Sequence, residues 1–116
     1  MATRIYKVLT EAELSEARAV GRFEGSADDR RDGFIHLSAA HQLEGTLAKH
    51  FAGRADLLLL TVDVEALGSA LRWEPSRGGA LFPHLYAPLP MVAVRDIAPL
   101  RLDDAGRHHL PEGTVA

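Results

Sequence analysis

The chain contains no cysteine, and features that define several common protein classes are missing as well. Without cysteine there is no disulfide framework, no thiol nucleophile and no zinc site with sulfur ligands. The longest strongly apolar run, LLLLTVDV, is far shorter than the ~20 residues that a helix needs to cross a bilayer. The N-terminal segment also lacks the basic region, apolar run and cleavage site of a signal peptide. We therefore expect no membrane partner and a cytoplasmic location.

Signatures of several enzyme and metal-binding classes are absent too. The sequence has no Gly-x-Ser-x-Gly, no phosphate loop of the P-loop type and no Gly-x-Gly-x-x-Gly after a strand, so the common hydrolase, NTPase and dinucleotide-binding folds have no support. Its six histidines include no His-x3-His pair, and the acidic residues within 28–32 lack a regular cation-binding loop. We expect no metal site, with the Arg-His-His run at 107–109 as the place for adventitious binding.

The composition that is present fits an ordinary domain. A length of 116 residues with 47% hydrophobic residues is enough to build a core without disulfides or metals. We expect a single domain over 1–116, with a core at about 4–102 and a C-terminal tail at 103–116. The formal net charge is −3 and the 13 lysines and arginines are scattered, which excludes a general nucleic-acid binder but leaves room for a local basic pocket.

Helix and strand patterns alternate along the chain, which indicates an α+β fold. The β-rich run at 4–9 predicts a strand with one face partly wet. Thr10 and Glu13 then match a capping box, and this predicts a helix that continues to about Val20. The polar, glycine-punctuated segment 21–33 predicts a loop beside a site, in which the charged residues within 28–32 are solvated and form internal ion pairs.

The second half of the chain has more β character. An apolar stripe between Ser38 and Gly53 predicts a second helix, and the non-alternating leucines at 57–60 predict a buried central strand. Strands are also predicted around 70–74 and within 91–102. The four prolines and paired glycines of 75–90 indicate a long ordered loop with one short extended piece.

Two pentapeptides share one pattern: FIHLS at 34–38 and FPHLY at 82–86 each place a histidine two residues before a hydroxyl. In an extended chain His36 and Ser38 lie on one face, and the same holds for His84 and Tyr86. Each pair can present an imidazole and a hydroxyl to a small polar ligand. The alternative is that each histidine is a half-buried residue whose hydrogen bonds are satisfied within the protein.

The segment RWEPSRGG brings further charged groups into the loop that leads to His84. Arg77 beside Gly78 and Gly79 resembles an anion cradle, because glycines let backbone N–H groups approach a phosphate while the guanidinium adds paired contacts. Glu74 is a carboxylate in the same segment. The alternatives are a solvated turn and a simple ion pair between Glu74 and a neighbouring arginine.

Several separated motifs together resemble the bacterial family known as domain of unknown function 952. They are IYKV at the start, DGFIHLS followed by Gln42 and Thr46, HFAG with ADLLLL, and LRWEPSRGGALFPHLY near the end. The family is similar in architecture to the ADP-ribosyltransferase fold, which grips NAD in a cleft of a split sheet. The resemblance implies a split mixed or antiparallel sheet with two main helices, and places His36 and Ser38 beside the ribose or nicotinamide of NAD. Lys7 stands where such enzymes carry an arginine or histidine.

Residues and resemblance together predict a cleft between the two histidine segments that binds a phosphate-containing or nucleotide-like small molecule. The implied activity is an NAD-dependent transfer of ADP-ribose or of a 2′-phosphate, with Glu74 and His36 as the catalytic groups. The alternatives are a non-catalytic binding module, and a structural or interaction protein with no cavity. The residues expected to bind the ligand are Ser38, Arg77, Gly78, Gly79, His84 and Tyr86.

Overall fold

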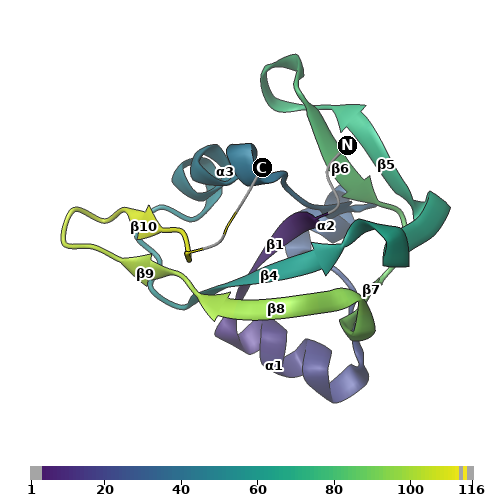
Figure 1. Ribbon diagram of the computed structural model, residues 1–116, viewed down its shortest axis with the longest axis horizontal. Coiled ribbons are helices and arrows are strands. Elements are labelled where there is room, and N and C mark those ends of the chain that lie inside the picture. Colours follow the sequence, from purple (N-terminus) through teal and green to yellow (C-terminus); the bar gives the residue numbers. More distant parts are fainter. Residues whose placement is uncertain (1–3, 113, 115–116) are drawn as a thin grey trace.

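Two three-stranded antiparallel sheets form the framework of the computed structural model, which describes residues 4–112 and 114. One sheet has the order β1-β4-β8 and the other has the order β3-β6-β5 (Figure 1). The elements are β1 (Arg4–Thr10), α1 (Glu11–Val20), β2 (Arg22–Phe23), α2 (Ala27–Asp32), β3 (Ile35–His36), α3 (Leu43–His50), β4 (Leu57–Asp63), β5 (Leu71–Pro75), β6 (Leu81–Leu85), β7 (Leu89–Pro90), β8 (Val94–Pro99), β9 (Arg101–Leu102) and β10 (His108–His109).

Among residues 4–112 and 114, one backbone bridge, between Tyr6 and Ser38, links the two sheets. The N–H of Tyr6 in β1 donates to the carbonyl of Ser38 at 2.8 Å, and the N–H of Ser38 donates back at 2.9 Å. Just before Ser38, Leu37 donates from its N–H to the carbonyl of Pro83, on the other sheet. The segment that follows β3 is therefore the seam of a split, antiparallel α+β architecture, and the pairings among the described residues contain no parallel strand.

Helix α1 forms where the capping pattern predicts it. The Thr10 side chain accepts from the N–H of Glu13 at 3.1 Å, and the Glu13 carboxylate accepts from the N–H of Thr10 at 2.9 Å. Gly21 ends the helix at a φ of 93°, a conformation that favours glycine. The helix buries Leu14 and Ala17 against the sheet.

The sheet β1-β4-β8 is covered by a helix on each face (Figure 1). On one face α1 packs in a core that also contains Ile5 and Leu60, together with Ile35 from the second sheet. On the other face α3 packs Leu43 and Leu47 in a separate core. The central position of β4 confirms the prediction from its run of leucines. Strand β1 is buried on both faces, so the expected wet face is wrong.

The polar segment 21–33 contains a helix, α2, where the sequence predicted a solvated loop. Ser26 and Asp29 form a second capping box, and Gly33 closes the helix at a φ of 86°. The segment has no apolar stripe because its inward-facing side chain is Asp29, which is only 2% exposed. Hydrophobic periodicity therefore could not reveal it.

Two other segments are more regular than predicted. The expected long loop at 75–90 contains β6, which pairs with β5 over five residue pairs from Leu71↔Leu85 to Pro75↔Leu81. The expected C-terminal tail contains β10, which pairs with β9 in a short hairpin. In both places the strand forms by pairing with a neighbouring strand. The residue pattern within the segment alone does not show which residues of the neighbour it pairs with.

Candidate functional site

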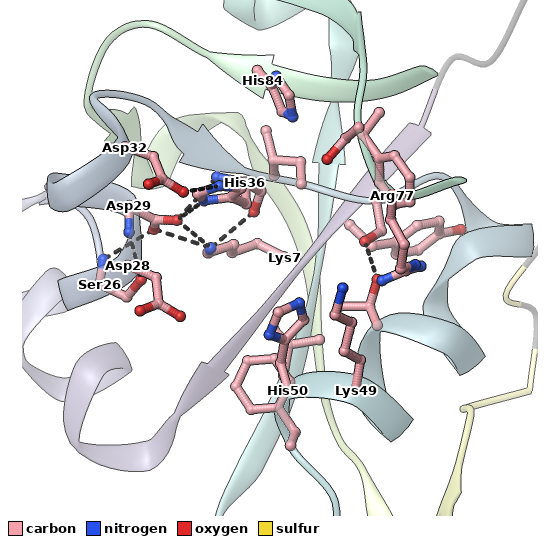
Figure 2. A pocket seen from close by; sticks show the side chains of 18 of the residues that line it. Lys7, Ser26, Asp28, Asp29, Asp32, His36, Lys49, His50, Arg77 and His84 are labelled. Carbon is pink, nitrogen blue, oxygen red and sulfur yellow. Dashed lines mark hydrogen bonds and ion pairs between the residues drawn. The ribbon is translucent and has the colours of Figure 1, made fainter. Parts of the chain in front are cut away.

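A cavity of about 280 Å³ opens beside the seam between the two sheets. Strands β1 and β3, helices α2 and α3 and the tip of the β5–β6 hairpin surround it (Figure 2). Several elements contribute polar side chains to its lining. The charged or titratable side chains of the lining include Lys7, Asp32, His36, Lys49, Arg77 and His84.

Asp29 is the centre of a buried network on the α2 side of the pocket. Its Oδ2 atom lies 3.1 Å from Nζ of Lys7 and accepts the N–H of Ser26 at 2.9 Å. Its Oδ1 atom accepts the N–H of His36 at 3.0 Å and lies 2.7 Å from Nδ1 of the same residue. Burial by itself raises the pKa of Asp29, but the His36 hydrogen bond, the Lys7 charge and the backbone N–H groups outweigh it and hold the pKa well below its usual range.

The ring of His36 lies between two carboxylates. Nδ1 contacts Asp29, and Nε2 lies 2.9 Å from Oδ2 of Asp32 (Figure 2). A histidine donates from both ring nitrogens only in its protonated form. The geometry therefore suits an imidazolium that fastens α2 to β3, and the pKa of Asp32 is lowered chiefly by its hydrogen bond with Arg31 and in part by His36.

His84 has one carboxylate partner, which lies away from the pocket. Nδ1 of His84 is 2.9 Å from Oε1 of Glu74, and the same oxygen accepts the hydroxyl of Tyr86 at 2.6 Å. The Tyr86 hydrogen bond, followed by that of His84, lowers the pKa of Glu74. Hydrogen bonding to Glu74 in turn raises the pKa of Tyr86. Glu74 is therefore a carboxylate that orients two neighbouring side chains.

Aromatic rings hold the two histidines in place. Phe34 stacks on His84 with ring centroids 4.0 Å apart and planes 28° apart, and it also contacts His36 and Tyr86. The rings of His36 and His84 meet edge to face at 5.7 Å. These contacts leave the imidazoles little freedom to rotate, so their nitrogen atoms have defined directions.

The opposite side of the pocket is basic. The guanidinium of Arg77 lies 4.8 Å from the ring centroid of Phe82 and packs against Gly45 of α3, where an added Cβ would stand 3.0 Å from Nη2. Lys49 lies on the same side (Figure 2). Burial and the positive charges of Lys49 and Arg77 lower the pKa of His50.

The two pentapeptides meet by pairing with each other. In the antiparallel pair β3–β6, Ile35 lies opposite Leu85 and His36 lies opposite His84. This confirms that the two histidines share one pocket. Ile35 and Leu37 are both buried as expected, but Leu37 also lines the pocket, although it was expected on the opposite side. The expected placement of the two segments across a cleft is wrong, because they are adjacent strands of one sheet.

The other predicted site residues are only partly brought together. Ser38 and Arg77 line the pocket, and the Ser38 hydroxyl lies 3.0 Å from that of Thr46. The residues found outside the pocket lining are Glu74, Gly78, Gly79 and Tyr86. Gly78 and Gly79 lie in the turn of the β5–β6 hairpin with positive φ, beside Arg77.

Sequence reasoning missed Asp29, Asp32 and Lys49 as pocket residues, and treated Lys7 only as a departure from a resemblance. The spacing of Ser26 and Asp29 matches the capping pattern used for α1, and it could have revealed α2. No local signal indicates that Asp29 faces inward to meet Lys7, because the two residues are 22 positions apart.

Residues 8–97 match the family described as "Protein of unknown function (DUF952)". The chain belongs to this family. The crystal structure of protein CC0527 from Caulobacter crescentus is similar, with 56% sequence identity and a TM-score of 0.89 over 92% of this chain and 94% of that chain. The solution NMR structure of CC0527 has 57% identity and a TM-score of 0.82 over 91% of both chains. No protein with a curated description matches the chain.

Residues 4–112 and 114 contain no helix that is both long enough and apolar enough to cross a membrane. The same residues contain no group of three or more histidine, aspartate or glutamate side chains arranged to hold a metal ion.

Proposed function

We propose that the pocket binds a small phosphate-bearing molecule. The observation that carries this proposal is the pair of cations, Lys49 and Arg77, which line one side of the cavity without an ion-pair partner among residues 4–112 and 114. The pKa of His50 is lowered chiefly by burial and further by the positive charges of Lys49 and Arg77. An anion placed there gains the attraction of both cations, and Arg77 offers a planar set of donors that suits phosphate.

The rest of the pocket lining supports a ligand with polar groups beyond its phosphate. Ser38, Thr46 and His84 offer hydroxyl and imidazole groups, and Phe82, whose ring lies beside the Arg77 guanidinium, supplies apolar surface. The cavity volume of about 280 Å³ lies just below the range of about 300–1,000 Å³ that is usual for small-molecule sites. A sugar phosphate or a mononucleotide therefore fits better than a whole dinucleotide, of which the pocket can enclose only a part.

An NAD-dependent transferase is the more specific candidate that the family resemblance implies. The observation in its favour is the joint presence in the lining of a basic side suited to phosphate and of two imidazoles, His36 and His84, that are held by ring contacts with Phe34. In this version a pyrophosphate oxygen lies at Arg77 and the nicotinamide ribose lies near His36. Glu74 then acts through His84, which it orients, and His36 is already engaged with Asp29 and Asp32.

Two rival functions make different predictions about the same pocket. A non-catalytic binding module binds the ligand and leaves it unchanged. A structural or interaction protein has no specific affinity for phosphate esters, and its histidines act only by holding α2 and the β5–β6 hairpin in place. Binding and turnover are therefore measured separately.

The test is a calorimetric titration of the protein with inorganic phosphate, AMP, ADP-ribose and NAD. We expect measurable binding of the phosphate esters, and a ligand at 100 times its Kd should stabilise the fold by ~2.7 kcal/mol. Arg77→Gln should weaken all of them, whereas Arg101→Gln, an exposed residue outside the pocket lining, should not. Equal binding by both variants contradicts the proposal. Release of nicotinamide from NAD separates the transferase from the binding module.

A further inference from the structure

The hydrogen bonds of Glu74 decide which nitrogen of His84 carries a proton. Oε1 of Glu74 accepts from the Tyr86 hydroxyl at 2.6 Å and lies 2.9 Å from Nδ1 of His84. An ionised carboxylate can only accept hydrogen bonds, so Nδ1 is the nitrogen that carries the proton. In the neutral ring Nε2 is then left with a lone pair.

The direction of that lone pair is fixed by packing. The His84 side chain is 5% exposed, its ring stacks on Phe34, and its backbone lies in β6 between β3 and β5. Within residues 4–112 and 114, Nε2 of His84 has no hydrogen-bond partner. In the same residues, every side-chain nitrogen or oxygen that is shut off from solvent has such a partner, so Nε2 is not shut off from solvent. Since His84 lines the pocket and Glu74 does not, Nε2 reaches open space through the pocket (Figure 2).

We propose that Nε2 of His84 accepts a hydrogen bond from a hydroxyl of the ligand, so that the pocket selects phosphate esters of polyols or sugars over phosphate esters without hydroxyls. This inference rests on the proposed phosphate binding at Arg77. His36 cannot serve in the same way, because Asp29 and Asp32 occupy both of its ring nitrogens. A buried acceptor left unpaired is costly, so a ligand that lacks the donor is rejected.

The experiment compares two probes that differ only in hydroxyl groups: glycerol 3-phosphate and n-propyl phosphate. Both carry a phosphate on a three-carbon chain, so Lys49 and Arg77 should attract the two phosphate groups equally. We expect wild type to bind glycerol 3-phosphate about tenfold more tightly, which is the effect of one hydrogen bond to a buried acceptor. Equal affinities in wild type overturn the inference.

Three variants locate the origin of the selectivity. His84→Phe keeps the stacked ring and removes the acceptor, so the two affinities should become equal. Glu74→Gln lets a side-chain N–H donate to Nδ1 and move the ring proton to Nε2, so the ratio should fall by roughly threefold. Arg77→Gln should weaken both probes to the same extent and leave the ratio unchanged.

The outcomes separate this inference from the function on which it rests. If neither probe binds to wild type, or if Arg77→Gln has no effect, the phosphate proposal fails and takes this one with it. If Arg77→Gln weakens both probes but the ratio survives in His84→Phe, only the hydroxyl selectivity is overturned. Nitrogen NMR of the His84 ring in wild type needs no variant: a proton on Nδ1 and a lone pair on Nε2 are expected, and a proton on Nε2 contradicts the inference.

Discussion

The ammonium of Lys7 lies 3.1 Å from a carboxylate oxygen of Asp29, and this buried ion pair joins the first strand to the helix beside the pocket. Nζ of Lys7 also donates to the carbonyl of His36 at 2.8 Å. One ammonium thus ties β1, α2 and β3 together at the pocket wall. A flexible lysine with three donors suits this junction, because its two partners, Asp29 and His36, lie in two other elements.

Asp29→Asn should destabilise the fold strongly. The change leaves the Lys7 ammonium buried without its counter-charge, and breaking a buried ion pair in this way costs about 3–5 kcal/mol. Asp28→Asn is the matched control, because Asp28 lies on the same helix and is exposed. That control should stay within about 0.5 kcal/mol of wild type. Urea denaturation of the three proteins measures the difference, and similar free energies of unfolding for all three would contradict the network.

The same carboxylate should make stability depend on acid pH. Because the pKa of Asp29 is lower in the folded protein than in the unfolded chain, its contribution is present above the unfolded pKa, near 3.9, and is lost as the pH falls below it. The free energy of unfolding of wild type should therefore decline more steeply between about pH 5 and pH 2 than that of Asp29→Asn. Parallel pH profiles for the two proteins would rule out this origin.

Gly45→Ala should reduce phosphate affinity without removing any charge. The new Cβ would lie 3.0 Å from Nη2 of Arg77 and push the guanidinium from its place over Phe82. An exposed Gly→Ala change within a helix otherwise stabilises it by up to about 1 kcal/mol. We expect unchanged or higher thermal stability together with about threefold weaker binding of phosphate. Glu44→Ala, at the exposed neighbouring position, should leave the phosphate affinity unchanged. An equal loss of affinity in this control would show that any change in the helix weakens binding, and would contradict the role of the contact between position 45 and Arg77.

Gln42→Glu should loosen the connection between α3 and the β5–β6 hairpin. Oε1 of Gln42 accepts the N–H of Ala39 at 2.9 Å, and Nε2 donates to the carbonyl of Leu81 at 2.8 Å. A glutamate has the same shape but brings an ionised oxygen against that carbonyl, at a cost of about 1–3 kcal/mol. Glu44→Gln, an exposed change of the reverse kind, serves as control. Thermal unfolding at neutral pH checks the prediction, and an unchanged midpoint for Gln42→Glu would contradict it.

The elements with strong local signals were predictable from the sequence. The capping box of α1 and the leucine run of β4 each depend on neighbouring residues, so their pattern is visible in a short window. The repeated pentapeptide indicated that His36 and His84 lie close together. It did not distinguish adjacent strands, which the structure shows, from opposite walls of a cleft.

The missed part of the site depends on contacts between distant residues. Asp29 lies in a run of charged residues whose composition indicates a solvated loop, and only Lys7, from another strand, explains its burial. Glu74 was expected to face the ligand, whereas the structure turns it towards His84 and Tyr86. Such choices are made by tertiary packing, which a single sequence records only indirectly.

The bridge between Tyr6 and Ser38 places the pocket where the backbones of the two sheets meet. Strands β1 and β4 share seven residue pairs, while the two sheets are joined by one. The backbone therefore resists separation least along this seam, and both bridge residues line the pocket that opens there. A molecule that touched Lys49 on one side and His84 on the other would contact both sheets across this seam. Its binding energy would add to the apolar core that Ile5, Leu60 and Ile35 share, so occupancy of the pocket would raise the free energy needed to separate the two sheets.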